Sequence, residues 1–257
     1  MSLNSENKTK FFPKGVLFVK IQKELSKFIE NVNQIIYENL DKKGIDLNKL
    51  KKNEYDKCIY KIQEKINLKY GTAYFFKNHR SLFESIFKKS KFYIQPYFYL
   101  RAIKPSNKKN PPPVNFHRES FFGPDFYKHL LNLWIPIKNY QLNNSMYYYP
   151  SSHLYERYKD FDILNKKTLI KKTSYAHKTG FSYEDKVIFF KKKINPKRLY
   201  KKNHIIFFSG QTLHGNAINL TKKIRMSLDM RFILSTNLVK NPIQSATGKK
   251  FFLRKLF

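Results

Sequence analysis

The stretch "IRMSLDMRF", residues 224–232, alternates between apolar and polar side chains at every position. Because successive side chains of a β-strand point to opposite faces, this alternation predicts a strand. Its apolar face comprises Ile224, Met226, Leu228, Met230 and Phe232. Its polar face comprises Arg225, Ser227, Asp229 and Arg231. A polar face usually meets solvent, but in a sheet that encloses a polar site the same pattern points arginine into a pocket.

Other parts of the chain have the character of short strands. They are "YIQPYFYLRAI" (93–103), "VNFHRES" (114–120), "LLNLWIPIK" (130–138), "DKVIFF" (185–190) and "HIIFFSG" (204–210). Before them, apolar residues recur three and four apart from 16 to about 90, which predicts helices, the last beginning with Ser81 as N-cap. Short strands after helices predict an α+β, mainly β fold. We expect a jelly-roll (double-stranded β-helix, cupin-like) core with a helical N-terminal flank.

A chain of 257 residues suits one domain. We expect residues 1–91 to form the helical flank packed on the core, and residues 92–257 to form the jelly-roll. The segment near 154–185 is polar and irregular in pattern. It is either a lid over the site or a surface insertion.

The formal net charge of +33 is extreme. It suits a nucleic acid, an anionic membrane or an acidic substrate as partner, but the lysines are scattered, and AT-rich codon usage produces the same excess. We therefore do not expect a nucleic-acid partner, although the charge leaves that alternative open. Cys58 is the single cysteine, which excludes an internal disulfide and a thiolate metal cluster. With no long apolar run and no signal peptide, we expect a cytoplasmic protein without a membrane span.

His117 and Glu119 stand two residues apart in "VNFHRES", so on a strand they project from one face. A lone His-x-Glu pair is common by chance. A third ligand, His214, follows the strand "HIIFFSG", and two histidines with one carboxylate on a jelly-roll form the facial triad of non-haem Fe(II) oxygenases. Arg225 lies eleven residues after His214, where its guanidinium can bind a carboxylate with help from the Ser227 hydroxyl.

The order "HRE … LNLWIPI … NNSMYYYPSSH … FFSGQTLHGNAINLTKKIRMSLDMRF" resembles the Fe(II)/2-oxoglutarate-dependent oxygenases of the phytanoyl-CoA dioxygenase superfamily. It looks closest to the bacterial branch that accompanies carbohydrate and antibiotic-sugar biosynthesis. The resemblance covers about residues 92–234. It implies an enzyme that couples decarboxylation of 2-oxoglutarate by O₂ to oxidation of a substrate.

The resemblance also implies roles for individual residues. His117, Glu119 and His214 would hold the iron, and Arg225 would pair with the distal carboxylate of 2-oxoglutarate with Ser227 assisting. The co-substrate pocket would also be lined by Asn132 and Trp134. His153, in the turn "PSSH", is interpreted as structural. The usual acid in this superfamily is aspartate, and Glu119 keeps the carboxylate while disfavouring halogenation, for which a small residue would be needed.

Three residues on one predicted strand, Tyr97, Tyr99 and Arg101, are candidate substrate contacts. They suit a small polar molecule, neutral or anionic, such as a sugar or sugar nucleotide. The tyrosines can equally be core residues and Arg101 the partner of a buried acid. Two other functions stay open: an oxygenase acting on nucleic acid, and a metal-binding cupin-like isomerase or binding module that would not need Arg225.

Overall fold

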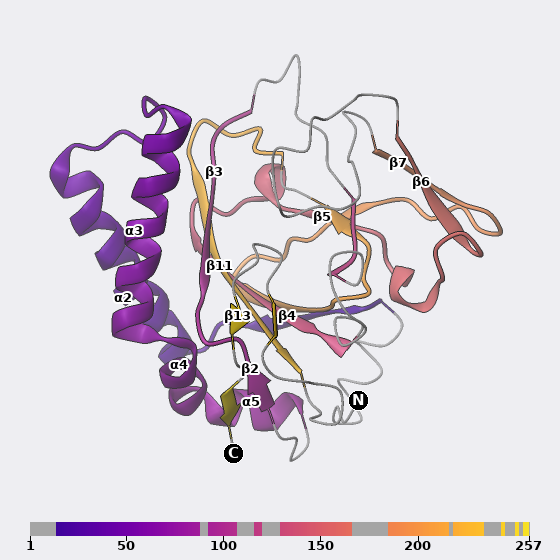
Figure 1. Ribbon diagram of the computed structural model, residues 1–257, viewed down its shortest axis with the longest axis horizontal. Helices are drawn as coiled ribbons and strands as arrows, with labels where there is room; N and C mark the ends of the chain where they lie inside the picture. The colour runs from indigo at the N-terminus through magenta and orange to yellow at the C-terminus, as the bar shows by residue number, and fades with distance from the viewer. Residues whose placement is uncertain are drawn as a thin grey trace.

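The computed structural model describes residues 14–87, 92–106, 116–119, 129–165, 185–215 and 218–233, together with the short strand segments 243–244, 250–251 and 254–256. The architecture is α+β, with helices on one side of antiparallel sheets (Figure 1). The α-helices are α2 (Lys23–Asn39), α3 (Lys52–Tyr70), α4 (Thr72–Asn78) and α5 (Arg80–Ile86).

A seven-stranded antiparallel sheet, which we call the main sheet, runs in the order β1-β9-β4-β11-β2-β14, and β3 also pairs with β11. Its strands are β1 (Val16–Lys20), β2 (Phe92–Ile94), β3 (Tyr99–Ile103), β4 (Leu131–Lys138), β9 (His204–Ser209), β11 (Arg225–Ile233) and β14 (Arg254–Leu256).

Three smaller sheets complete the described strands. One, which we call the small sheet, has the order β10-β5-β8; the others are the pairs β6–β7 and β12–β13. Their strands are β5 (Tyr147–Tyr148), β6 (Phe161–Asn165), β7 (Asp185–Phe189), β8 (Lys197–Arg198), β10 (His214–Gly215), β12 (Ile243–Gln244) and β13 (Lys250–Phe251).

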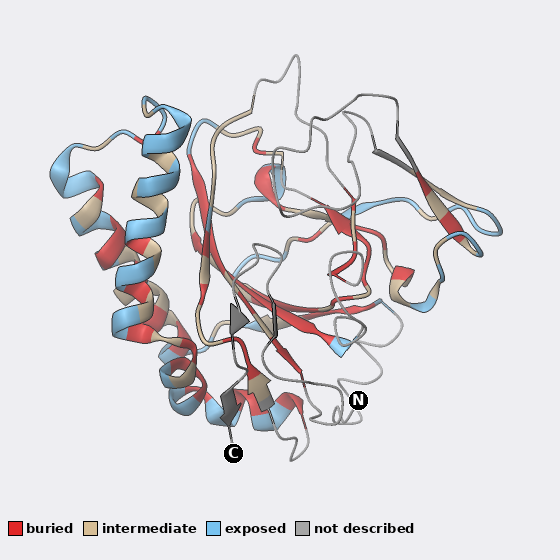
Figure 2. Cartoon of the chain, viewed as in Figure 1, coloured by how far each residue is buried: buried red, intermediate tan, exposed pale blue. Residues whose placement is uncertain are grey.

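The apolar face of β11 packs against the helices, as its alternation predicts. Met226, Leu228, Met230 and Phe232 belong to the largest buried cluster, which continues into α2–α5. Figure 2 shows the buried residues concentrated along β11, β4 and the inner sides of the helices. The helices therefore cover one face of the main sheet and leave the other face for the rest of the fold.

The polar face of β11 lies on the opposite side and is shared by its neighbours. In the register, Arg231 lies opposite Asn132 and Asp229 opposite Trp134. Trp134 packs with Phe208 from β9 and Tyr148 from β5 in a second cluster, so this side faces the small sheet. We call it the inner face of the main sheet. It is enclosed rather than open to solvent, since Arg225 is 2% exposed and Ser227 is fully buried.

Several expectations from the sequence are wrong in detail. Residues 16–20, included above in the helical flank 1–91, form β1 and pair with β9 over Val16–Lys20. Helix α5 begins at Arg80 with His79 as N-cap, and Ser81 lies inside the helix. The predicted strand 93–103 is two strands, β2 and β3, interrupted after Ile94.

The segment near 154–185 is not irregular throughout. Its described part includes β6, which pairs with β7 from Phe161 to Asn165, and Phe161 is fully buried. Residues 166–184 of this segment lie outside the described residues, so the interpretation of 154–185 as a lid stays a prediction. Among the described helices, none combines the length and the apolar character needed to cross a membrane.

Candidate metal centre

His117 and His214 lie opposite each other on two adjacent extended segments. Each backbone N–H donates to the carbonyl of the other residue, at 2.7 Å from His117 and 3.0 Å from His214. Directly opposite residues of an antiparallel pair project from the same face, and the two imidazole rings lie 4.4 Å apart between centroids. Of the predicted strand 114–120, the described residues 116–119 contribute an isolated bridge at His117.

Glu119 completes a cluster of three possible metal ligands, His117, Glu119 and His214, which we call the metal cluster. Its backbone N–H donates to the Gly210 carbonyl at 2.8 Å, which ties this segment to the turn that precedes His214. One ligand atom from each of His117, Glu119 and His214 lies within 4.8 Å of the others. This separation suits atoms that surround a single cation, and two imidazoles with a carboxylate fit Fe(II).

The orientation of His214 suits a ligand. Its Nδ1 lies 2.8 Å from the Thr212 carbonyl, which can only accept, so Nδ1 carries the proton and Nε2 of the neutral ring is free to bind a metal. Burial lowers the pKa of His214 below its ordinary value, although Glu119 opposes this. The low pKa favours the neutral form that a metal requires.

Glu119 is buried, with 4% of its surface exposed. Burial raises its pKa, but Arg231, then His214 and His117, act in the opposite direction, and the result is a pKa below the ordinary value. Arg231 Nη2 lies 3.0 Å from Oε2. Arg231 therefore has a direct contact with the cluster, which the sequence interpretation did not assign.

Arg225 lies on the same inner face but forms no ion pair with a carboxylate among the described residues. Its Nη1 donates to Ser227 Oγ at 3.1 Å, and its guanidinium carbon lies 5.2 Å from the centre of the Trp134 ring. Because Trp134 is opposite Asp229 in the register, the side chain leans along the sheet toward the metal cluster. Its buried Nε has no hydrogen-bond partner among the described residues. Desolvation lowers the pKa of Arg225 to about 10.

Asn132 is the second buried donor without a partner on this face. Its Nδ2 has no acceptor among the described residues, and Asn132 lies opposite both Arg231 and Phe208 in the sheet. The Phe208 ring is in turn 4.9 Å from the His214 ring. Asn132 thus lies at the end of the inner face nearest the metal cluster.

The structure gives the candidate substrate residues partners of their own. The Tyr99 hydroxyl receives a hydrogen bond from Gln95 Nε2 at 2.9 Å and lies 3.4 Å from the Tyr97 hydroxyl. Arg101 forms an ion pair with Asp229 at 3.1 Å, and its side chain is 49% exposed. Arg101 therefore lies at the rim of the inner face, paired with an acid as the alternative interpretation expected.

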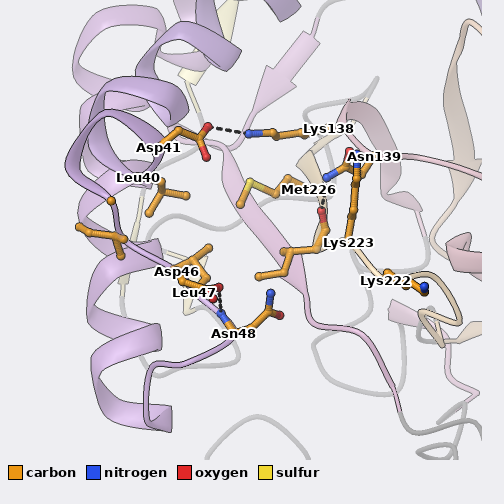
Figure 3. Close-up of a pocket in the computed structure, with 13 residues that line it drawn as sticks. Leu40, Asp41, Asp46, Leu47, Asn48, Lys138, Asn139, Lys222, Lys223 and Met226 are labelled. Atoms are coloured by element: carbon orange, nitrogen blue, oxygen red, sulfur yellow. Dashed lines mark hydrogen bonds and ion pairs between the residues drawn. The ribbon is translucent and has the colours of Figure 1, made fainter.

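A cavity of about 430 Å³ lies on the other side of the main sheet (Figure 3). It is lined by Ile224 and Met226, which flank Arg225 in sequence but point toward the helices, and by the ion pair of Lys138 with Asp41 at 2.8 Å. None of the predicted metal or co-substrate residues lines it. The cavity is therefore separate from the candidate metal centre.

No protein-family model matches the chain, and no curated protein matches it in sequence. The resemblance to the phytanoyl-CoA dioxygenase superfamily therefore stays a prediction. Solved structures do match. The apo form of ThoJ, described as a non-heme monooxygenase, has 12% identity and a TM-score of 0.51 over 89% of this chain and 77% of that one. The chain shares its fold with ThoJ.

Two further structures align at lower TM-scores. EvdO2 from Micromonospora carbonacea var. aurantiaca, complexed with 2-oxoglutarate, has 13% identity and a TM-score of 0.48 over 94% of this chain and 95% of that one. SnoN, a non-heme alpha ketoglutarate dependent epimerase from nogalamycin biosynthesis, has 12% identity and a TM-score of 0.46 over 90% and 83%. At these identities the similarity concerns the fold alone.

Proposed function

We propose that the protein is a non-haem Fe(II)- and 2-oxoglutarate-dependent dioxygenase that acts on a small polar molecule. The proposal includes a jelly-roll core, in which successive strands of the chain switch between two facing sheets. One sheet would be the part of the main sheet that contains β3, β11, β4 and β9. The other would contain residues 116–119, β10, β5 and β8. Helices α2–α5 then cover the outer face of the main sheet.

The observation that carries the proposal is a pair of unsatisfied donors beside the metal cluster. Arg225 Nε and Asn132 Nδ2 are both buried on the inner face without a described acceptor. A buried donor without an acceptor costs about 1–3 kcal/mol, more for a charged group, so both positions favour an acceptor-rich ligand. 2-Oxoglutarate is a dianion with acceptor oxygens at both ends, so it would supply acceptors to both donors while bound to a metal at the histidines.

The metal cluster would hold the iron. His117, Glu119 and His214 would bind Fe(II), with the Thr212 carbonyl fixing the tautomer of His214. Fe(II) held there would supply the oxidising chemistry from 2-oxoglutarate and O₂, with succinate and CO₂ as the co-products.

The inner face would bind and orient the co-substrate. Arg225, assisted by Ser227, would bind the distal carboxylate, and the Trp134 ring would exclude water from it. Asn132 would donate to the co-substrate near the metal. The inner face thus sets the orientation of the co-substrate and leaves its chemistry to the iron.

The substrate would approach over Tyr97, Tyr99 and Arg101, at the exposed rim of the inner face. Two phenols and a half-exposed guanidinium suit a molecule with hydroxyl groups, such as a sugar or sugar nucleotide. Hydroxylation is the reaction we propose. The same oxidising chemistry also supports desaturation, epimerisation and ring closure.

The test is conversion of 2-oxoglutarate to succinate by purified protein with Fe(II) and O₂, without added substrate. Slow conversion is expected, and His117→Ala is expected to abolish it. His204→Ala is a matched control, because His204 lies at the start of β9 with its Nδ1 2.6 Å from the Lys202 carbonyl and belongs to no ligand cluster among the described residues.

Absence of conversion together with absence of Fe(II) binding would contradict the proposal. Metal binding that is insensitive to Arg225→Ala, with no consumption of 2-oxoglutarate, would favour a cupin-like isomerase or binding module. Tight binding of nucleic acid that persists at about 200 mM salt would favour a nucleic-acid substrate, because purely phosphate-directed contacts weaken steeply with salt.

A further inference from the structure

The peptide unit that joins Thr212 to Leu213 is hydrogen-bonded at both ends, and one end contacts the candidate metal ligand His214. Its carbonyl accepts from His214 Nδ1 at 2.8 Å. Its N–H donates to the Ser152 hydroxyl at 2.7 Å. Because a trans peptide is planar, a bond that fixes the direction of its N–H also fixes the direction of its carbonyl. The Ser152 hydroxyl and the His214 ring are therefore linked through one rigid unit.

The hydrogen bonds in this connection all have the same direction. The Tyr149 carbonyl can only accept, so the Ser152 hydroxyl donates to it, at 2.7 Å, and accepts from Leu213. Hydrogen bonds that follow one another in this way polarise and strengthen each other. We call this chain of bonds, from the His214 ring through the 212–213 peptide and Ser152 to Tyr149, the serine relay.

The serine relay is closed to solvent. Ser152, Thr212 and Leu213 are fully buried. Tyr149 and His214 are each 5% exposed. A buried N–H without an acceptor is destabilising, so loss of the Ser152 hydroxyl would favour rotation of the peptide toward another acceptor. The Thr212 carbonyl would rotate with it and lose its alignment with the His214 ring.

Ser152 also contacts the segment that carries the other two candidate ligands. Arg118 stands between His117 and Glu119 in the sequence. Its Nη2 donates to the Ser152 carbonyl, and its guanidinium carbon lies 4.5 Å from the centre of the Phe161 ring. Arg118 is buried in this position. Ser152 therefore joins the two ligand-bearing segments, one through its hydroxyl and the other through its carbonyl.

Resting on the metal site of the function proposed above, we propose that Ser152 is a positioning residue for His214. Its hydroxyl holds the 212–213 peptide in the orientation in which the Thr212 carbonyl keeps the proton on His214 Nδ1. Nε2 then stays free for the metal. Ser152 contacts neither the metal position nor the imidazole, and it acts through the peptide alone.

Ser145 provides a matched control within the same chain. Like Ser152, it is fully buried, and its Oγ donates to the carbonyl three residues earlier, that of Leu142, at 2.9 Å. Its own carbonyl also accepts from an arginine, Arg198 Nη1, at 2.8 Å. No donor among the described residues bonds to its hydroxyl. Ser145→Ala therefore removes the same group from the same kind of turn without affecting the peptide beside His214.

The first measurement compares Ser152→Ala with Ser145→Ala by NMR of the imidazole nitrogens in metal-free protein. The spectrum distinguishes the two neutral tautomers, and His214→Gln identifies the signals of His214. For wild type and Ser145→Ala we expect the proton on Nδ1. For Ser152→Ala we expect a measurable population with the proton on Nε2. A role limited to stabilising the fold would not change the tautomer.

The second measurement is the affinity for Co(II) by titration calorimetry. For Ser152→Ala we expect binding weakened by about tenfold, the lower end of what loss of an outer partner of a metal ligand costs. For Ser145→Ala we expect wild-type affinity. Ser152→Cys replaces Ser152→Ala if the latter does not fold, with smaller changes in both measurements because a thiol is a weak acceptor.

Three results would overturn the inference and leave the proposed function intact. They are an unchanged tautomer in Ser152→Ala, wild-type Co(II) affinity in that variant, and equal losses of affinity in both alanine variants. Failure of the unmutated protein to bind Co(II) would instead overturn the proposed function. The tautomer comparison needs no metal, so it would then decide by itself whether Ser152 orients His214.

Discussion

Replacing Arg225 by methionine is expected to stabilise the protein without ligands while abolishing its response to 2-oxoglutarate. The guanidinium is 2% exposed, and no described carboxylate forms an ion pair with it. Removing a charge from water without pairing it destabilises the folded state. Methionine has a similar length and no charge, so it fills the same space without this penalty.

The magnitude follows from the pKa. Desolvation lowers the pKa of Arg225 to about 10. Since one pKa unit corresponds to about 1.4 kcal/mol, burial of the charge costs roughly 3 kcal/mol. The Ser227 hydroxyl and the Trp134 ring each lose an interaction of about 1 kcal/mol in the variant. The net gain is about 1 kcal/mol, or about 2–4 °C in Tm for a chain of this size.

The assay is thermal unfolding of metal-loaded protein at neutral pH, with and without 2-oxoglutarate. At a concentration about 100-fold above Kd, the co-substrate should stabilise wild type by about 2.7 kcal/mol and the variant by almost nothing. Arg225→Lys is the control that keeps a buried charge, and it should not gain stability. A lower Tm for Arg225→Met, combined with a retained shift by 2-oxoglutarate, would refute the reasoning.

Three other predictions concern metal, backbone and pH. Chelator treatment should lower the Tm of wild type but not of His117→Ala, measured by thermal unfolding with and without Fe(II) or Co(II). Gly15→Ala should lower the free energy of unfolding by at least about 1–2 kcal/mol and weaken Co(II) binding. Gly15 has φ +70°, and a Cβ there would lie 2.5 Å from His153 Nδ1 and from Thr212 Oγ1. Chemical denaturation measures the first effect, and calorimetry measures the second. Burial lowers the pKa of His79, so its protonation favours the unfolded chain and unfolding free energy should fall as pH drops from about 6.5 toward the lowered value. His79→Phe should flatten that pH dependence, and an unchanged slope would contradict it.

The sequence predicted the inner face well because period-two alternation is a local property. It placed Arg225 and Ser227 on one side of a strand and Met226 and Leu228 on the other, and the register agrees. The same argument put His117 and Glu119 on one face. What it did not supply was their distance from His214, which depends on a pairing between segments about a hundred residues apart.

The errors arise where tertiary pairing overrides local pattern. Residues 16–20 have apolar spacing that continues into α2, and they form a strand because β9 provides the partner. His79 is both the C-cap of α4 and the N-cap of α5, a junction that leaves no position for Ser81 as a cap. Arg231 was visible in the alternation, but its contact with Glu119 follows from the pairing of remote segments.

The turn at Gly15, near the start of the described residues, helps to hold His214 in place through Thr212. Thr212 Oγ1 donates to the Gly15 carbonyl at 2.9 Å, across 197 residues of sequence, and the backbone carbonyl of the same threonine orients His214. During synthesis, β1 must wait for β9 before it finds its partner. A nascent chain halted before that point would therefore present an unpaired edge to other chains, and the candidate metal centre would be among the last parts of the molecule to mature.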